Sequence, residues 1–144
     1  MPITTGTTNV VKQAAAEAQF PAGSTIKAIL IKVGAAGTYD NTYATPYPGA
    51  GSMADEVPTG NGYTAGGQTL AGRTAGVASG IGYVDYSDVV WTAVGALSAI
   101  GCAFWDVTLS RWAGFIDFGG KTATDGAFTV QVPGDGGSGL ARIS

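Results

Sequence analysis

The sequence contains no histidine, one cysteine and few charged residues. Charged side chains make up 12% of its 144 residues, about half the share found in an average soluble domain. Without histidine there is no His-based catalytic triad, no His metal ligand and no histidine pH switch. A single cysteine excludes an internal disulfide framework. Because Cys102 stands among Ile100, Ala103 and Phe104, we expect it to be a small, buried apolar side chain.

Clustered basic residues and long apolar runs are also lacking. The seven lysines and arginines are scattered, and the net charge is −3, so no basic stripe is present and we expect no direct binding of nucleic acid. No apolar run approaches the roughly 20 residues of a membrane span. The first ten residues, MPITTGTTNV, lack the apolar segment of a signal peptide. We therefore expect no membrane contact and synthesis in the cytoplasm.

The stretch that organises the chain is Ile81–Gly120, which holds all three tryptophans and the cysteine. Its aromatic and β-branched residues recur with a period of two, which is typical of half-buried strands. The pattern predicts strands at Tyr83–Val90, Ala99–Val107 and Arg111–Phe118. Thr108–Ser110 is short enough to close a hairpin between the last two. We expect these strands to form one antiparallel sheet that supplies the core.

The rest of the chain adds a short helix and several strands. Thr8 or Asn9 is a suitable helix cap, and the alanines that follow favour a helix to about Gln19. Ser24–Val33 is the clearest single strand, and Leu70–Ala78 is expected to be an edge strand. Two further strands are predicted after a turn that ends in Asp-Gly: Ala127–Val132 and Leu140–Ile143.

These elements predict a mainly β fold. With 24 glycines and many short strands, the chain is typical of an antiparallel β-sandwich with one short N-terminal helix. We expect one domain over residues 1–144, with an N-terminal arm and helix at 1–20 and a long loop at 34–64. A loop of that length is uncommon in a compact domain and is usually functional or disordered.

Tyrosines mark this loop as a candidate interface. Tyrosine combines a large contact area with a polar tip and is enriched where proteins bind each other. We expect the loop to lie against a partner chain, the alternative being an Ω-like loop that packs its tyrosines on its own domain. Met1–Gln19 and Tyr39–Pro58 look weakly committed to the core, and we expect at least one of them to pack on a partner chain and to be mobile in the free protein. The predicted interface residues are Val10, Val11, Tyr39, Tyr43 and Tyr47.

No catalytic, cofactor or metal site is predicted. The densest carboxylates are Asp85 and Asp88, with Asp106 and Asp117 on later strands. Asp85 and Asp88 are three residues apart on one predicted strand and would point to opposite faces, while the other two end strands, where turn chemistry explains an aspartate. The glycine-rich GNGYTAGG lacks the GK[ST] of a phosphate loop, and no calcium-loop spacing is present. We expect a protein that is not an enzyme.

Several motifs together resemble small structural proteins of tailed bacteriophages. A GYTAGG-type turn, a strand ending in tryptophan, a DFG-type strand end and a GxF strand before a proline occur in that family in this order, after a helix and a TIKxxL strand. The resemblance covers most of the chain but not Gly34–Pro58. The segments that carry it are Thr25–Leu30, Gly62–Leu70, Tyr83–Trp91, Ile116–Lys121 and Asp125–Val130.

This resemblance implies a jelly-roll cement, or decoration, protein on the outside of a phage capsid. The expected partners are the major capsid protein and neighbouring copies of the chain, as a dimer or higher homo-oligomer, and the expected location is the virion surface after synthesis in the host cytoplasm. Two alternatives stay open. One is a tail or head-fibre subunit, and the other, from a different class, is a carbohydrate-binding β-sandwich.

Overall fold

The computed structural model describes residues 9–40, 42–132 and 141–143. Within them the chain is mainly β, with antiparallel pairing and one short helix. The predicted helix is confirmed, because α1 spans Asn9–Gln19. The strands are β1 (Ile26–Ile31), β2 (Gln68–Thr69), β3 (Thr74–Ala78), β4 (Ile81–Asp85), β5 (Val89–Thr92), β6 (Ala96–Asp106), β7 (Arg111–Thr124), β8 (Ala127–Val130) and β9 (Ala141–Ile143).

The chain groups into two compact units, and each is described by itself. Unit 1 takes the described residues up to Gly23, the segment Ala71–Ser87 and the described residues from Gln131 onward. Unit 2 takes Ser24–Leu70 and Asp88–Val130. The sequence predicts one domain over residues 1–144. Within that span the residues form two groups that contact one another mainly inside each group.

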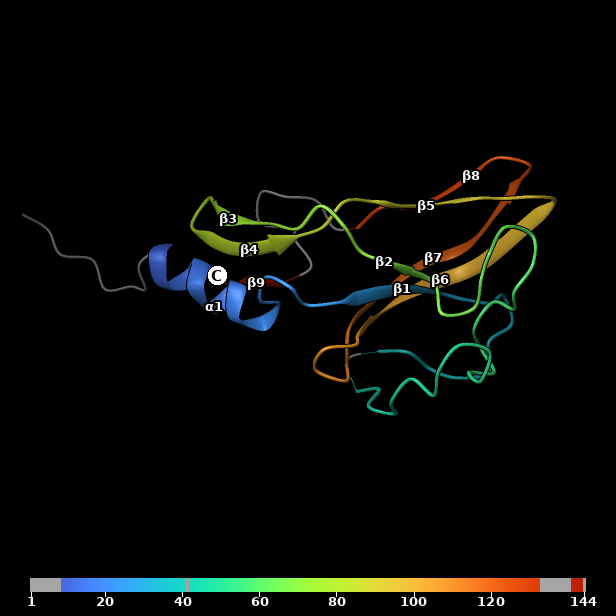
Figure 1. Cartoon of the computed structure of the whole chain (residues 1–144), viewed down its shortest axis with the longest axis horizontal. Coiled ribbons are helices and arrows are strands. Elements are labelled where there is room, and N and C mark those ends of the chain that lie inside the picture. The colour runs from blue at the N-terminus through green and yellow to red at the C-terminus, as the bar shows by residue number, and fades with distance from the viewer. Residues whose placement is uncertain (1–8, 41, 133–140, 144) are drawn as a thin grey trace, which may run out of the picture. The chain divides into compact units, whose positions relative to one another are not determined.

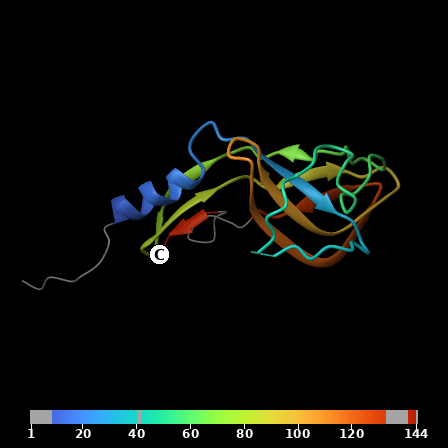
Figure 2. The same ribbon diagram turned by 90° about the horizontal axis from the view of Figure 1, so that it is seen from below.

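Unit 1 is a helix packed on a small antiparallel sheet of order β3-β4-β9. Ala16 of α1 and Phe20, which directly follows the helix, are buried, and Figure 2 shows the helix running alongside β3 and β4. The approach is close at Gly82, where an added Cβ would lie 2.3 Å from the backbone oxygen of Lys12. Lys12 Nζ also donates a hydrogen bond to the carbonyl of Gly80, at 2.7 Å. The short helix is therefore held by tertiary packing, as a marginal helix requires.

Unit 2 contains the main sheet, of order β2-β1-β6-β7. Its longest ladder joins β6 to β7, from Ala96↔Thr124 to Asp106↔Arg111. The predicted hairpin at Thr108–Ser110 is thus confirmed. In the second strand pair, β5 with β8, strand β8 follows a turn at Asp125-Gly126, where Asp125 adopts φ 47°. That turn is also as predicted.

The two sides of the main sheet carry different layers. On one side Trp91 of β5 lies between Tyr63 and Phe128, with ring centroids 5.7 and 6.4 Å away. Phe128 also contacts Phe118 of β7, at 6.0 Å. Figure 1 shows β5 and β8 on this side and the segment 34–57, drawn in cyan and teal, on the other. The core of unit 2 lies between the sheet and β5–β8, where Phe104 is fully buried.

One strand prediction is wrong. The pattern from Tyr83 to Val90 continues without a break, but the chain forms two strands there, β4 in the β3-β4-β9 sheet and β5 paired with β8. The ladder ends because Asp85 Oδ1 accepts a hydrogen bond from the amide of Tyr86, and the amide of Ser87 donates to Ala71. The central sheet therefore keeps its last two predicted strands and gains β1 in place of the first.

Candidate functional site

One face of the main sheet carries three rows of cross-strand partners. Lys27, Trp105 and Trp112 form one row; Ile29, Ala103 and Phe115 the next; and Ile31, Gly101 and Asp117 the third. Directly paired residues share a face of a sheet. Both tryptophans, Phe115 and Asp117 therefore project on the same side.

Three loop tyrosines pack on this face. Tyr39 contacts Phe115, with ring centroids 6.0 Å apart, and Tyr43 contacts both Trp112 and Phe115, also at 6.0 Å. Tyr47 lies 6.2 Å from Trp105 and 6.0 Å from Trp112. Together these rings form what we call the aromatic surface. Its members are Tyr39, Tyr43, Tyr47, Trp105, Trp112 and Phe115, of which only Trp105 is buried and the others are half-buried.

Asp55 fastens one part of the loop. Its carboxylate accepts hydrogen bonds from the amides of Ala36 and Gly37 at 3.1 and 2.8 Å, and from the hydroxyl of Tyr39 at 2.6 Å. The bond from Tyr39, followed by the two amide bonds, lowers the pKa of Asp55 below its ordinary value. Burial, then the bond to Asp55, raises the pKa of Tyr39. The Tyr39 ring is thereby fixed against the sheet with its hydroxyl turned to the loop.

Glu56 fastens the other part. It is 5% exposed and accepts from the hydroxyls of Tyr47 and Tyr63, both at 2.7 Å, and from the amide of Gly66 at 2.6 Å. Burial, with the bond to Glu56 second, raises the pKa of both tyrosines. Tyr63 also accepts a bond from the amide of Leu30 in β1, at 3.2 Å. The carboxylate therefore ties the loop, the following turn and the sheet together.

Asp55 gives the loop a defined dependence on pH. A carboxyl group whose pKa is lower in the folded than in the unfolded state stabilises the fold above its unfolded pKa, about 4, and this contribution is lost as the pH falls through the folded value. We expect Asp55→Asn to destabilise the protein at pH 7, and the difference from wild type to shrink below about pH 4. Urea unfolding at several pH values measures this. A difference that is constant with pH would contradict it.

The predicted interface residues fall into two groups. Tyr39, Tyr43 and Tyr47 lie together on the aromatic surface of unit 2, while Val10 and Val11 belong to α1 of unit 1. Val11 is exposed, and the side chain of Val10 lies outside the described residues. Binding of a partner by these five residues stays a prediction.

The expectation that Tyr39–Pro58 is weakly committed to the domain is wrong. Its rings pack on its own sheet, as in the alternative of an Ω-like loop, and Trp112 Nε1 donates to the carbonyl of Thr45 at 2.7 Å. Backbone bonds from Lys32 to Asp55 and from Val57 to Leu30 join the loop to the end of β1. For the other segment, Met1–Gln19, the helix is packed on β4, and residues 1–8 lie outside the described residues.

Sequence reasoning missed Asp55 and Glu56. They stand in a stretch without regular pattern, and the four carboxylates that did attract attention lie elsewhere. A usable signal was present: the loop has three acidic residues and no basic residue between Gly34 and Thr64, alongside four tyrosines. Tyrosine hydroxyls are natural donors to a carboxylate that has no cation near it in the sequence.

The four carboxylates singled out from the sequence do not converge. Asp85 is in unit 1, and Asp88 is exposed at the start of unit 2's second segment. Asp106 is buried at the end of β6, where it accepts from the amide of Leu109 and lies 3.6 Å from Arg111 Nε. Asp117 is further along β7, opposite Gly101. Among the described residues no three acidic or cysteine side chains gather as metal ligands would.

Cys102 is buried, as predicted, with 1% exposure, and burial raises the pKa of its thiol. Thiolates react, and a buried thiol of raised pKa is inert. We expect no reaction of the native protein with a thiol-specific disulfide reagent at pH 8, and one equivalent after unfolding in urea. Rapid labelling under native conditions would show that β6 opens readily.

The comparisons with known proteins add no relative. No protein-family model, curated protein or solved structure matches the chain. Within the described residues, no helix has the length and apolar character needed to cross a bilayer.

Proposed function

We propose that the chain is a structural protein of a tailed-bacteriophage virion, and specifically a cement protein that binds the outside of the capsid. The observation that carries this proposal is the aromatic surface. Five half-buried aromatic rings on one sheet face offer large, rigid contact area of the kind enriched at protein interfaces. The motifs shared with small phage structural proteins supply the setting.

The proposed mechanism is passive. Copies bind across joints between capsid subunits and, by binding only the assembled shell, stabilise it by mass action. Each contact can be weak, because many copies act on one shell. The sparse charge of the chain, 12% of residues, fits a protein that covers part of its surface in an assembly. Neighbouring copies on the shell are the second proposed partner.

The proposed architecture of unit 2 is a jelly-roll-like sandwich. Its support is the position of β5–β8 on one side of the β2-β1-β6-β7 sheet, where the buried Phe128 packs on Trp91 of β5 and on Phe118 of β7. In this arrangement the aromatic surface is on the outer side of the larger sheet and the loop 34–64 shapes it. The sequence of this loop, which lies largely outside the motifs that resemble phage proteins, would then make the surface specific for one capsid.

The acidic side chains also favour a binding role over catalysis. Asp55 and Glu56 each accept three hydrogen bonds from neighbouring groups, so their oxygens are used in holding the loop. A glycosidase needs two carboxyl groups facing one substrate bond. Asp106 is instead used at a hairpin turn, and Asp117 is on a separate part of β7.

Binding to purified shells tests the proposal. Wild-type protein should bind expanded capsids at a copy number near that of the major capsid protein, and Tyr43→Ser should reduce the affinity at least about tenfold, since a central interface tyrosine contributes roughly 1.4 kcal/mol or more. Tyr83→Ser, at a half-buried tyrosine of unit 1, is the matched control. A few copies per particle, or equal loss in both variants, would reject the cement role.

Two alternatives have their own readouts. A tail or head-fibre subunit would be found at low copy number on the particle rather than on the shell. A carbohydrate-binding protein is favoured by the same row of half-buried rings, because sugar rings stack on aromatic side chains. Binding to immobilised bacterial glycans that is lost in Trp112→Ala would favour it.

A further inference from the structure

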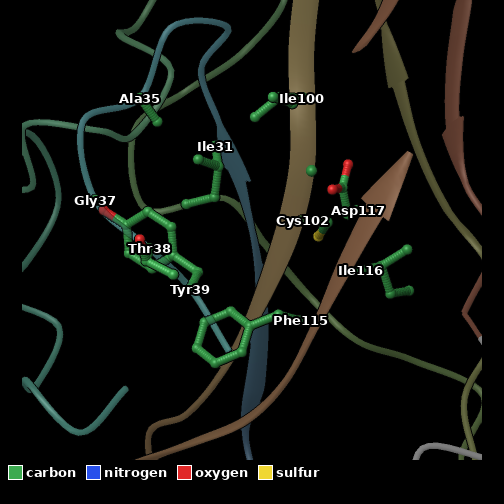
Figure 3. A pocket seen from close by; sticks show the side chains of 11 residues that line it. Ile31, Ala35, Gly37, Thr38, Tyr39, Ile100, Cys102, Phe115, Ile116 and Asp117 are labelled. Atoms are coloured by element: carbon green, nitrogen blue, oxygen red, sulfur yellow. The ribbon is translucent and has the colours of Figure 1, made fainter. Parts of the chain in front are cut away.

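A pocket opens beside the aromatic surface, between the loop and the end of the main sheet. Its volume is about 280 Å³, slightly below the usual range of sites for drug-sized ligands. The residues that give it its character are Ile31, Gly37, Tyr39, Gly101, Phe115 and Asp117. Figure 3 shows the rings of Tyr39 and Phe115 on one side and the Asp117 carboxylate further along, across strand β6. The size suits one side chain or one small ring.

Gly101 lines the pocket and adds no side chain to it. Gly101 is the middle of the row Ile31–Gly101–Asp117, so nothing projects from the sheet between an apolar and an acidic neighbour. A glycine is required there, because an added Cβ would lie 2.5 Å from the backbone oxygen of Ile116. The hollow is thus part of the sheet's own geometry.

The lining combines aromatic rings with one carboxylate. Phe115 and Asp117 are alternate residues of β7 and so project on the same face, and the Tyr39 ring lies 6.0 Å from Phe115. The Tyr39 hydroxyl is occupied with Asp55, which leaves its ring as the contact surface. One Asp117 oxygen accepts from the amide of Gly119, at 2.7 Å. No lysine or arginine is among the residues that line the pocket.

Within the part of the chain that the structure describes, Asp117 has no ion pair, and aromatic rings beside such a carboxylate are suited to a cation. A lysine or arginine head within about 6 Å of a ring centroid is attracted to the ring, and a carboxylate adds a charge-assisted hydrogen bond. A sugar would need several hydrogen-bonding partners. Thr38, Tyr39 and Asp117 are the only lining residues with an oxygen in the side chain, and the Tyr39 hydroxyl is occupied with Asp55. The net charge of −3 also favours a cationic ligand.

We infer that this pocket receives a single lysine or arginine side chain of the partner chain. The inference rests on the proposed function, since it names the chemistry by which the surface of another virion subunit is recognised. The aliphatic stem of the side chain packs on Ile31 and Phe115, and its charged head meets Asp117. The aromatic surface supplies contact area, and the pocket fixes the position of the partner chain on that surface.

Titration of the ¹⁵N-labelled full chain with small probes tests the inference. The probes are Nα-acetyl-lysine methylamide and Nα-acetyl-arginine methylamide, with the norleucine analogue as the uncharged control and N-acetylglucosamine for a sugar. We expect one of the two cationic probes to shift the amides of Gly101 and Asp117, and Asp117→Asn to weaken its binding at least about tenfold. Asp88→Asn, an exposed carboxylate of the same unit, should leave binding unchanged.

The other outcomes overturn the inference. Equal shifts with the norleucine probe would make the pocket a purely apolar site, and shifts with the sugar alone would make it a glycan site. No shift with either cation at high millimolar concentration would remove the pocket as a recognition site. Native-like spectra of Asp117→Asn establish that a loss of binding is local.

Shell binding separates this inference from the proposed function. If wild-type protein binds capsids and Asp117→Asn binds them equally well, the cement role stands and the pocket inference fails. If the cationic probes bind but the protein does not bind capsids, the pocket stands and the cement role fails.

Discussion

Replacing Phe104 by alanine should lower the free energy of unfolding by about 3–5 kcal/mol. Phe104 has 0% exposure and lies near the end of β6, where its backbone partners are Ala28 and Gly114. Those neighbours are small, so no large side chain next to it in the ladder can fill the space that it leaves. The loss therefore has two parts: the free energy that burial of the ring contributes to folding, and the cost of the cavity left in the folded protein. Urea unfolding at pH 7 measures it.

Phe115→Ala is the matched control for this change. Phe115 is on the neighbouring strand β7 but is half-buried on the face covered by the loop, so its removal should cost clearly less. Trp91→Ala, at a side chain that is also buried, should fall in the same range as Phe104→Ala. A loss below about 1 kcal/mol for Phe104→Ala would place the core of unit 2 elsewhere.

Replacing Glu56 by glutamine should cost about 3 kcal/mol. The change keeps the size of the side chain but puts an amide group, which donates hydrogen bonds, where one of two carboxylate oxygens accepts from Tyr47, Tyr63 or Gly66. Hydrogen bonds to a charged group contribute roughly 1.5–3 kcal/mol each, and a buried donor left without an acceptor is costly. We also expect the loop 34–64 to pack less tightly on the sheet in this variant.

Two measurements check the Glu56 prediction. Urea unfolding gives the loss of stability, and near-ultraviolet circular dichroism reports whether the tyrosine and tryptophan rings keep their packing. Asp88→Asn, at an exposed carboxylate outside the loop, should lower the free energy of unfolding clearly less than Glu56→Gln does. If Glu56→Gln behaves like Asp88→Asn, the loop is held by its rings and backbone bonds alone.

Much of the secondary structure could be predicted because its signals are local. The helix begins at Asn9, β1 lies inside Ser24–Val33, and the β6–β7 hairpin turns at the expected residues. The error at Tyr83–Val90 has a physical cause. Alternation of polar and apolar residues continues through Asp85–Asp88, but the Asp85 side chain and the bond from Ser87 to Ala71 end the ladder. Which strands pair was likewise beyond a pattern read along the chain.

The candidate site was only half predictable. The tyrosines of the loop stood out by type, whereas their support depends on Asp55 and Glu56, whose role appears only when residues far apart in sequence meet. The same holds for the pocket, which depends on Gly101 facing Asp117 across two strands. A glycine within an apolar strand gives no sign of the space that it leaves.

The division into units has a consequence for how the protein is made. The chain enters unit 2 at Ser24, returns to unit 1 at Ala71, enters unit 2 again at Asp88 and leaves it after Val130, so neither unit is a continuous segment. The apolar β1 can pair with β6 only after Ala96–Asp106 has left the ribosome, and contacts so distant in sequence form slowly. Until then IKAILI is an unpaired strand edge, open to association with other chains. Yield should therefore depend on the speed of translation and on chaperones more than on the stability of the finished fold.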